Sequence, residues 1–274
     1  MELKKGYKKT EVGVIPNDWD ARLIRYVCKL INGRGFKPHE WKTSGLPIIR
    51  IQNLNGSDDF NYYTGSYNPK IQVETGQLLF AWSGSRGTSF GPHVWGGGRA
   101  LLNYHTWKVA VNESKTTQEF LLHALRHLTS YIEDRAHGAS ALVHTQKWEM
   151  EKFSILIPSS LPEQRAIAAA LSDVDGLIGG LEQLIAQKRD LKQAAMQQLL
   201  TGKKRLAGFR GEWAVKTLGE IGKFKNGINK ANEDFGHGFP FVNLMDIFGI
   251  AKVSNRALFG LVNSTSAERE SFTN

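Results

Sequence analysis

The stretch that decides the fold runs from residue 161 to residue 200 and reads LPEQRAIAAALSDVDGLIGGLEQLIAQKRDLKQAAMQQLL. Ser160 and Glu163 form a capping box, Pro162 suits the first helical turn, and Gly202 is the expected C-cap. At 1.5 Å per residue, about 38 helical residues make a rod of roughly 57 Å. One face of the rod carries apolar residues at alternating spacings of four and three, namely Ile167, Leu171, Val174, Ile178, Leu181 and Ile185.

This helix, with its caps, is the second of three predicted segments and covers residues 159–202. A rod of that length cannot bury its apolar stripe against one small domain. We therefore expect the stripe to pack on another helix, as in a coiled coil.

The residues before the helix, 1–158, have the pattern of a mixed α/β domain. Short apolar runs bounded by turn residues predict strands at 48–54, 76–82, 104–111 and 153–157. A capping box at Thr116 and Glu119 predicts a helix with one apolar face that continues through Ile132. The expected fold is therefore a globular α/β domain followed by a long coiled-coil-type helix.

The chain begins to repeat itself after the helix. Trp19 and Trp213 are 194 residues apart, and so are Gly33 and Gly227. A repeat unit of this length indicates duplicated domains. We therefore interpret residues 203–274 as the start of a second domain, truncated, and expect this part to be incompletely folded or to dock on the first domain.

Charge and composition limit the class of protein. The chain has 35 Lys and Arg against 26 Asp and Glu, a net charge of +9. This suits an anionic polymer or an anionic membrane, although a basic protein with neither partner stays an alternative. No run reaches the ~18 apolar residues that span a bilayer, and the N-terminus has no signal-peptide core. We expect a cytoplasmic protein without membrane contact.

Enzyme and metal signatures are missing from the sequence. It has no Asn/Asp-Pro-Pro-Tyr/Phe motif and no phosphate-binding loop. Its single cysteine, Cys28, excludes a cysteine-rich zinc site and a disulfide framework. His123 and His127 have the spacing of zinc ligands but lack further partners, so we interpret them as surface histidines. We predict no catalytic residues and no metal site.

Four loops of the first domain are rich in polar residues of the types that proteins use to read the edges of DNA bases. Arginine suits guanine, Asn and Gln suit adenine, and Ser and Thr suit either. The alternative is that these residues are ordinary turn formers and solvated charges. Trp82 and Trp95 are expected in the core rather than against bases. The DNA-binding candidates are Arg34, Lys37, Gln52, Asn53, Asn55, Ser83, Ser85, Arg86, His144, Gln146 and Lys147.

These landmarks together resemble the specificity subunit of type I restriction–modification systems. The run Leu161–Asp175, continued through Leu181-Glu182 to Gln197–Lys203, looks like the central helix of that family. Ile15-Pro16 with Trp19 looks like the beginning of its recognition domain, and Leu78–Ser85 looks like the strand and loop at the domain's centre.

The resemblance implies a sequence-specific, non-catalytic DNA-recognition subunit with two target-recognition domains, separated by two antiparallel helices that act as a ruler. Each domain would read one half of a bipartite site in double-stranded DNA. Methylation and restriction subunits would dock on it, and those partners would use S-adenosylmethionine, ATP and Mg; no cofactor is expected in this chain. The sequence departs from the family by ending inside the second copy, which predicts a C-terminally truncated subunit.

Four interpretations stay open. Two copies of the chain could pair through the long helix as a homodimer and so imitate the lost duplication. The chain could instead be an inactive truncated remnant. A part of a nuclease or methyltransferase, and a coiled-coil adaptor without DNA specificity, are less well supported, because the first lacks catalytic motifs and the second leaves the α/β domain unexplained.

Overall fold

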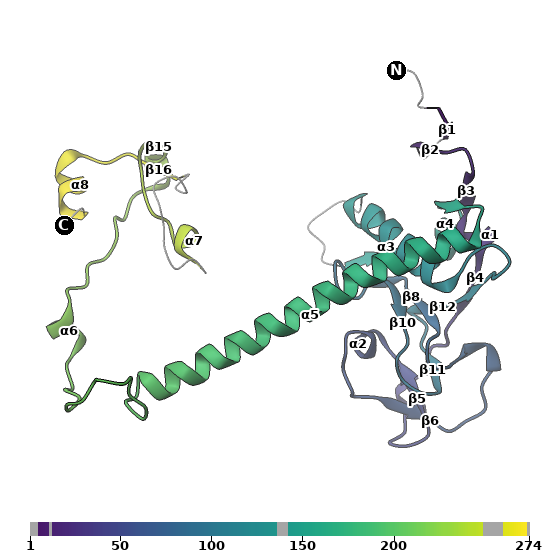
Figure 1. Ribbon diagram of the computed structural model, residues 1–274, viewed down its shortest axis with the longest axis horizontal. Helices are drawn as coiled ribbons and strands as arrows, with labels where there is room; N and C mark the ends of the chain where they lie inside the picture. Colours follow the sequence, from purple (N-terminus) through teal and green to yellow (C-terminus); the bar gives the residue numbers. More distant parts are fainter. Residues whose placement is uncertain (1–4, 11–12, 136–141, 249–259, 273–274) are drawn as a thin grey trace. The chain divides into compact units, whose positions relative to one another are not determined.

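The structure, a computed structural model, describes residues 5–10, 13–135, 142–248 and 260–272. The chain forms two compact units, Met1–Leu191 and Lys192–Asn274, and each is described by itself. The first unit contains an α/β domain and most of the long helix α5 (Leu161–Leu199) (Figure 1). None of the helices in the described ranges is long and apolar enough to cross a membrane.

Two four-stranded sheets form the centre of the α/β domain. The first has the order β10-β8-β12-β4 with antiparallel neighbours, and the second has the order β6-β5-β11-β7, in which only β11 and β5 are parallel. Their bounds are β4 (Cys28–Asn32), β5 (Leu46–Ile49), β6 (Asn61–Tyr63), β7 (Gln72–Val73), β8 (Leu78–Ala81), β10 (Gly91–Val94), β11 (Ala100–Leu102) and β12 (Thr106–Val111).

Strand β8 is buried along its whole length because it separates two parts of the core. Leu78 and Phe80 join the apolar cluster under helix α3 (Gln118–Arg135), whereas Leu79 joins a cluster shared with the second sheet. Side chains alternate between the faces of a strand, so a strand covered on both faces is a continuous apolar run. The domain is therefore layered, with α3, the first sheet, a shared core and the second sheet.

Smaller elements complete the first unit. Three antiparallel pairs are β1–β2, β3–β14 and β9–β13. The strand bounds are β1 (Tyr7–Thr10), β2 (Gly13–Pro16), β3 (Trp19–Leu23), β9 (Ser83–Ser85), β13 (Leu142–His144) and β14 (Ser154–Pro158). The short helices are α1 (Ile24–Val27), η1 (Pro38–Glu40), α2 (Ile51–Leu54), η2 (Pro69–Ile71) and α4 (Lys147–Met150).

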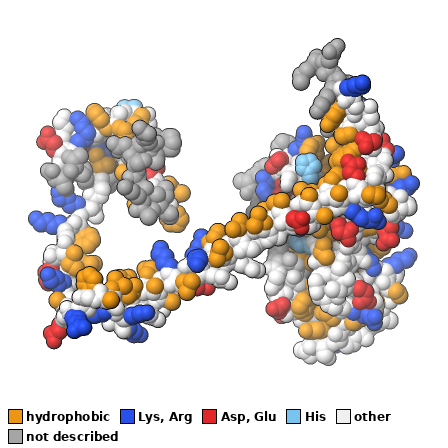
Figure 2. Space-filling view, in the orientation of Figure 1, with side chains coloured by type: hydrophobic (Ala, Val, Ile, Leu, Met, Phe, Trp, Pro, Cys, Tyr) orange, Lys and Arg blue, Asp and Glu red, His pale blue; other side chains and the backbone are white. Residues whose placement is uncertain are grey.

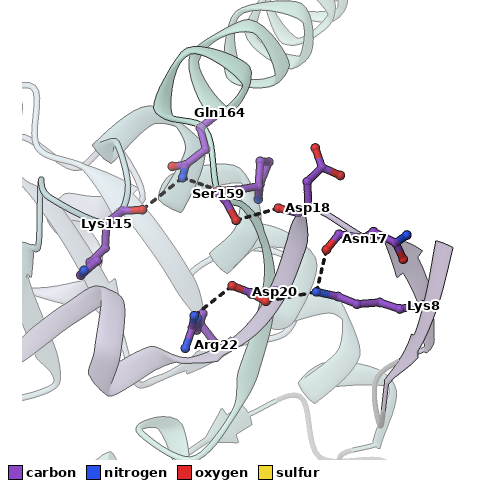
Figure 3. Close-up of polar contacts among 9 residues, drawn as sticks. Lys8, Asn17, Asp18, Asp20, Arg22, Lys115, Ser159 and Gln164 are labelled. Atoms are coloured by element: carbon purple, nitrogen blue, oxygen red, sulfur yellow. Dashed lines mark hydrogen bonds and ion pairs between the residues drawn. The ribbon is translucent and has the colours of Figure 1, made fainter. Parts of the chain in front are cut away.

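The long helix is attached to the domain through polar contacts at its first turn. The side chain of Gln164 is fully buried, and its Nε2 donates to the backbone oxygens of Lys115 (3.1 Å) and Pro158 (2.9 Å). Its Oε1 accepts from the backbone N–H of Thr117 (3.2 Å). Figure 3 shows this side chain reaching from α5 to Lys115, beside the bond from Ser159 Oγ to the backbone oxygen of Asp18 (2.7 Å).

Two more contacts hold the next turns of α5 against α3. The Nε2 atom of His123 lies 3.1 Å from the Oγ of Ser172, and Arg126 forms an ion pair with Asp175. Ile167, which the sequence placed in the stripe for a partner helix, packs on the core of its own domain. From Leu171 onward the stripe is exposed, and Figure 2 shows it as a row of hydrophobic side chains along α5.

The predicted fold class is confirmed: a mixed α/β domain precedes a long helix. Three local expectations are wrong, and one of them is the start of the strand expected at 104–111, since β12 begins at Thr106. The strand expected at 48–54 ends at Ile49, because Asn53 bonds back to the N–H of Arg50 (3.0 Å) and starts the helical turn α2. Helix α3 is capped by Thr117, whose Oγ1 accepts from the N–H of Phe120 (3.2 Å), and not by Thr116.

Contacts between distant segments join the described residues of the second unit. Strands β15 (Phe235–Pro240) and β16 (Leu261–Val262) pair in antiparallel fashion, and Lys230 forms an ion pair with Glu268 (2.7 Å). Gly202, with a φ of 69°, ends the long helix as expected. The helices are α6 (Leu218–Ile221), η3 (Asn232–Asp234), α7 (Leu244–Ile247) and α8 (Ser266–Phe272).

Candidate nucleic-acid interface

Two of the four predicted polar loops are joined by a strand pair. In the β9–β13 ladder, Ser83 lies opposite His144 and Ser85 lies opposite Leu142. The Oγ of Ser89 accepts from the N–H of Ser85 (2.7 Å) and holds the end of β9. The ladder therefore brings Ser83 and Ser85 beside His144, although the two loops are about 60 residues apart in the sequence.

The turn between β11 and β12 joins this ladder. The N–H of Trp82 donates to the oxygen of His105 (3.1 Å), and the N–H of Thr145 donates to the oxygen of Trp82 (3.0 Å). The indole Nε1 of Trp82 also donates to the oxygen of Tyr104 (2.8 Å). Trp82 thus connects the turn at 103–106 to the segment that leads into Gln146 and Lys147.

A third polar loop, after β4, lies against the same turn. Arg34 forms an isolated parallel bridge with Asn103, and the backbones approach so closely that a Cβ on Gly33 would lie 2.0 Å from the oxygen of Asn103. Glycine is needed here because only a residue without a side chain allows this approach.

The Arg34 side chain is engaged within the protein. Its guanidinium forms an ion pair with Glu40 and lies 4.8 Å from the ring centre of Phe36 and 4.9 Å from that of Tyr63. The backbone N–H of Lys37, together with Arg34, lowers the pKa of the Glu40 carboxyl. The Lys37 side chain is exposed.

In the fourth loop, Gln52 and Asn53 donate to backbone oxygens of the loop itself. Asn53 is buried, and its Nδ2 donates to the oxygens of Ser57 (3.0 Å) and Asp59 (2.9 Å). The Nε2 of Gln52 donates to the oxygen of Asp59 (3.2 Å), and Asn55 is exposed. Asn53 lines a different hollow from the other three loops, together with Gly96–Gly98.

The three joined segments enclose a pocket of about 280 Å³, which we call the aromatic pocket. Its walls come from the end of β4, from Trp82 after β8, from the 103–106 turn with the start of β12, and from the segment that leads into α4. The lining residues are Asn32, Gly33, Trp82, Tyr104, Trp107, Thr145, Gln146 and Lys147. Gln146 and Lys147 are among the residues predicted from the sequence to bind DNA, whereas Asn32 and Tyr104 are not.

Three of the five buried side-chain atoms without a hydrogen-bond partner in the described residues belong to residues next in sequence to ones that line this pocket. Arg34 Nη1, Asn103 Oδ1 and Thr106 Oγ1 are buried and have no hydrogen-bond partner in the described part of the chain. Buried polar atoms are almost always paired in proteins, so these unpaired atoms, in the loop after β4 and in the 103–106 turn, are unusual. In the same described residues, no group of three or more His, Cys, Asp or Glu side chains forms a metal site.

Tyr104 is not among the sequence candidates, because the pattern of residues 104–111 predicts one continuous strand. Strand β12 begins only at Thr106, and Tyr104 lies in the preceding turn and is 47% exposed. An aromatic dipeptide in a turn, Tyr104-His105, was the available signal. Trp95 is buried as expected, while Trp82 is only partly buried and borders the pocket.

The architecture is therefore a mixed α/β domain, with polar loops gathered on one face, followed by a long helix. The family model described as Type I restriction modification DNA specificity domain matches residues 16–187. The chain belongs to this family.

Curated relatives agree with the family. The chain is 28% identical over 196 residues to the type I restriction enzyme EcoBI specificity subunit of Escherichia coli, covering 69% of this chain and 40% of that protein. It is 26% identical over 217 residues to the MjaVIII specificity subunit of Methanocaldococcus jannaschii, covering 74% and 50%. The chain thus spans about half the length of these relatives.

Solved structures support the fold. The S subunit of a type I restriction–modification system from M. genitalium matches with a TM-score of 0.50 and 18% identity, over 97% of this chain and 65% of that one. The HsdS subunit from Thermoanaerobacter tengcongensis matches with a TM-score of 0.51 and 18% identity, over 72% and 48%.

Proposed function

We propose that the chain is a sequence-specific DNA-recognition subunit that directs a type I restriction–modification complex to its target. The observation that carries the proposal is the convergence of three polar segments on one face, around the aromatic pocket, in a domain of this family. Catalysis would belong to methylation and restriction subunits, which would use S-adenosylmethionine, ATP and Mg.

Within this face, the side chains best placed to reach DNA are those that do not build the fold. His144 and Gln146 are exposed, and Lys147 is partly exposed, with its Nζ 3.7 Å from Glu151. Arg34 and Asn53 are engaged inside the protein, so we assign them a supporting role in shaping the loops rather than direct base contacts.

A DNA-selection experiment tests this function. The full chain is incubated with a pool of random duplexes, and retained sequences are amplified over several rounds. Enrichment of a defined sequence is expected. Gln146→Ala should then weaken binding to the selected site by about 1–3 kcal/mol, the usual value of an amide–base contact. Gln187→Ala, an exposed glutamine on α5, is the matched control and should leave binding unchanged.

The salt dependence of the affinity for DNA distinguishes side chains that contact bases from side chains that contact phosphates. Lys147→Ala should weaken binding to all sequences alike and reduce the slope of log affinity against log salt by about one. Recovery of random sequences from the selection would contradict DNA recognition by this chain.

The exposed stripe of α5 supports a second part of the proposal, a partner helix from another copy of the chain. Five stripe residues are 44–54% exposed, namely Leu171, Val174, Ile178, Leu181 and Ile185. At 1.5–3 kcal/mol for full burial of such a side chain, covering them would contribute roughly 4–7 kcal/mol per helix. A symmetric homodimer would present two recognition domains to a bipartite, symmetric DNA site.

Light scattering tests the homodimer. The full chain should have the mass of a dimer at micromolar concentration, and Leu181→Glu should give a monomer because it places a charge in the apolar contact. Gln183→Glu, an exposed change on the same helix turn, is the control and should stay dimeric. A monomeric wild-type chain would contradict self-association and favour the inactive-remnant alternative if DNA selection also fails.

A further inference from the structure

We propose that the aromatic pocket receives a single nucleobase turned out of the DNA stack. The proposal rests on the DNA-recognition function above and adds a ligand and a binding site to it. It is carried by three features of the pocket: a column of stacked rings, a polar rim and a rigid floor.

The column begins in the core and ends at the pocket. Phe80 stacks on Trp107 with ring centres 5.8 Å apart and an interplanar angle of 21°, and Trp107 stacks on Trp82 at 6.1 Å and 22°. Phe80 and Trp107 are at most 2% exposed, whereas Trp82 is only partly buried and borders the pocket. The ring of His105 also lies beside Trp82 in a T-shaped arrangement, with ring centres 5.4 Å apart, so only part of Trp82 borders the pocket. One more flat ring can stack on an exposed aromatic surface of this kind, which is how proteins bind unpaired bases.

The second wall is Tyr104, which projects from the turn. The residue is 47% exposed, and the centre of its ring lies 3.8 Å from that of His105. Large aromatic side chains are usually covered in a folded domain, so two aromatic residues bordering one hollow favour a flat apolar ligand.

The rim of the pocket can bond to the edge of a base. Asn32 and Gln146 each carry an amide with donors and an acceptor, and Lys147 adds a cationic donor. Such groups match the hydrogen-bonding edge of a base that has left its partner strand. The volume of about 280 Å³ lies just below the ~300–1,000 Å³ range of sites for drug-sized ligands, so it suits one ring system rather than a whole oligonucleotide.

The floor of the pocket is rigid before any ligand binds. Trp82 is tied to the turn through its backbone N–H and its indole Nε1, and Gly33 lies in close backbone contact with Asn103. A preformed site loses little conformational freedom on binding, which favours affinity.

The experiment uses the full chain and the duplex obtained by DNA selection. A set of duplexes is prepared in which one nucleotide at a time is replaced by an abasic site. The base at that position on the complementary strand then has no pairing partner. Turning an unpaired base out of the stack costs less free energy than turning out a paired one. The duplex with the abasic site at one particular position should therefore bind the chain at least tenfold more tightly than the intact duplex does, a gain of about 1.4 kcal/mol. Tyr104→Ala should reduce that gain to less than twofold, and Tyr104→Phe should keep it.

Tyr26→Ala is the matched control. Tyr26 is 40% exposed and lies in α1, so its loss should leave the tenfold gain intact. Thermal unfolding of each variant checks that the domain is folded. If a sequence is selected but no position gains affinity, or if Tyr104→Ala keeps the gain, the pocket proposal is overturned and DNA recognition stands. If no sequence is selected, both proposals fail.

Discussion

Replacement of Gln164 by alanine should loosen the junction between the long helix and the α/β domain. The side chain is fully buried and makes three hydrogen bonds to backbone groups of Lys115, Thr117 and Pro158. Each buried bond contributes a net stabilisation of roughly 1 kcal/mol. Their joint loss should therefore lower the free energy of unfolding by about 3 kcal/mol, because the truncated side chain leaves the backbone groups without partners.

A second substitution at the same position tests the mechanism. Gln164→Glu keeps the shape but places an acceptor oxygen against the two carbonyl oxygens that now receive the amide N–H groups. At pH 7 it should destabilise the protein at least as much as alanine does. A simple loss of packing would instead make glutamate the milder change.

Urea unfolding followed by tryptophan fluorescence measures both variants, and Arg165→Ala is the control. Arg165 is exposed on the next position of α5, so its removal should change stability by no more than about 0.5 kcal/mol. The reasoning is refuted if Gln164→Ala costs less than about 1 kcal/mol, or no more than the control. Hydrogen exchange at the amide of Thr117 gives a local check, because this N–H should lose protection in Gln164→Ala.

Three further outcomes follow from local geometry and burial. Gly33→Ala should destabilise the domain by about 2 kcal/mol, because its Cβ would meet the oxygen of Asn103 at 2.0 Å, whereas Gly35→Ala, with its nearest neighbour at 3.8 Å, should be close to neutral in thermal unfolding. Burial lowers the pKa of His93, so the stability that this side chain confers is present above its unfolded pKa of about 6.5 and is lost as pH falls through its folded pKa. With His93→Gln, the free energy of unfolding measured in urea should depend less on pH between pH 7 and pH 5.5, and an unchanged slope would contradict this. Burial raises the pKa of the Cys28 thiol to about 12, so a thiolate-specific reagent should label it only after unfolding, and rapid labelling of the native protein would be inconsistent with the fold.

Elements with a strong periodic pattern were predictable. The helix that starts after Ser160 has a local capping hydrogen bond and carries an apolar repeat, and both are visible in consecutive residues. The buried strand β8 could be recognised as a continuous apolar run between turn residues. The polar loops could be identified for the same reason, since turn residues mark them in the sequence.

The sequence did not show which polar side chains of those loops build turns and which lie in the strand ladder beside His144. Asn53 and Ser83 are both small polar residues near the end of an apolar run, yet Asn53 builds a turn and Ser83 lies in the ladder beside His144. Which role a polar side chain has depends on the backbone groups that come within about 3 Å, and those groups arrive from other segments.

By itself, the sequence determined the α/β class, the long helix with its apolar stripe and the presence of polar loops, because these properties arise from interactions between residues close in the chain. Only the tertiary structure decided that Gln164 locks the helix to the domain and that Trp82 and Tyr104 border one pocket. These features come from pairings between segments tens of residues apart, where the register of strands and the packing of the core select the neighbours.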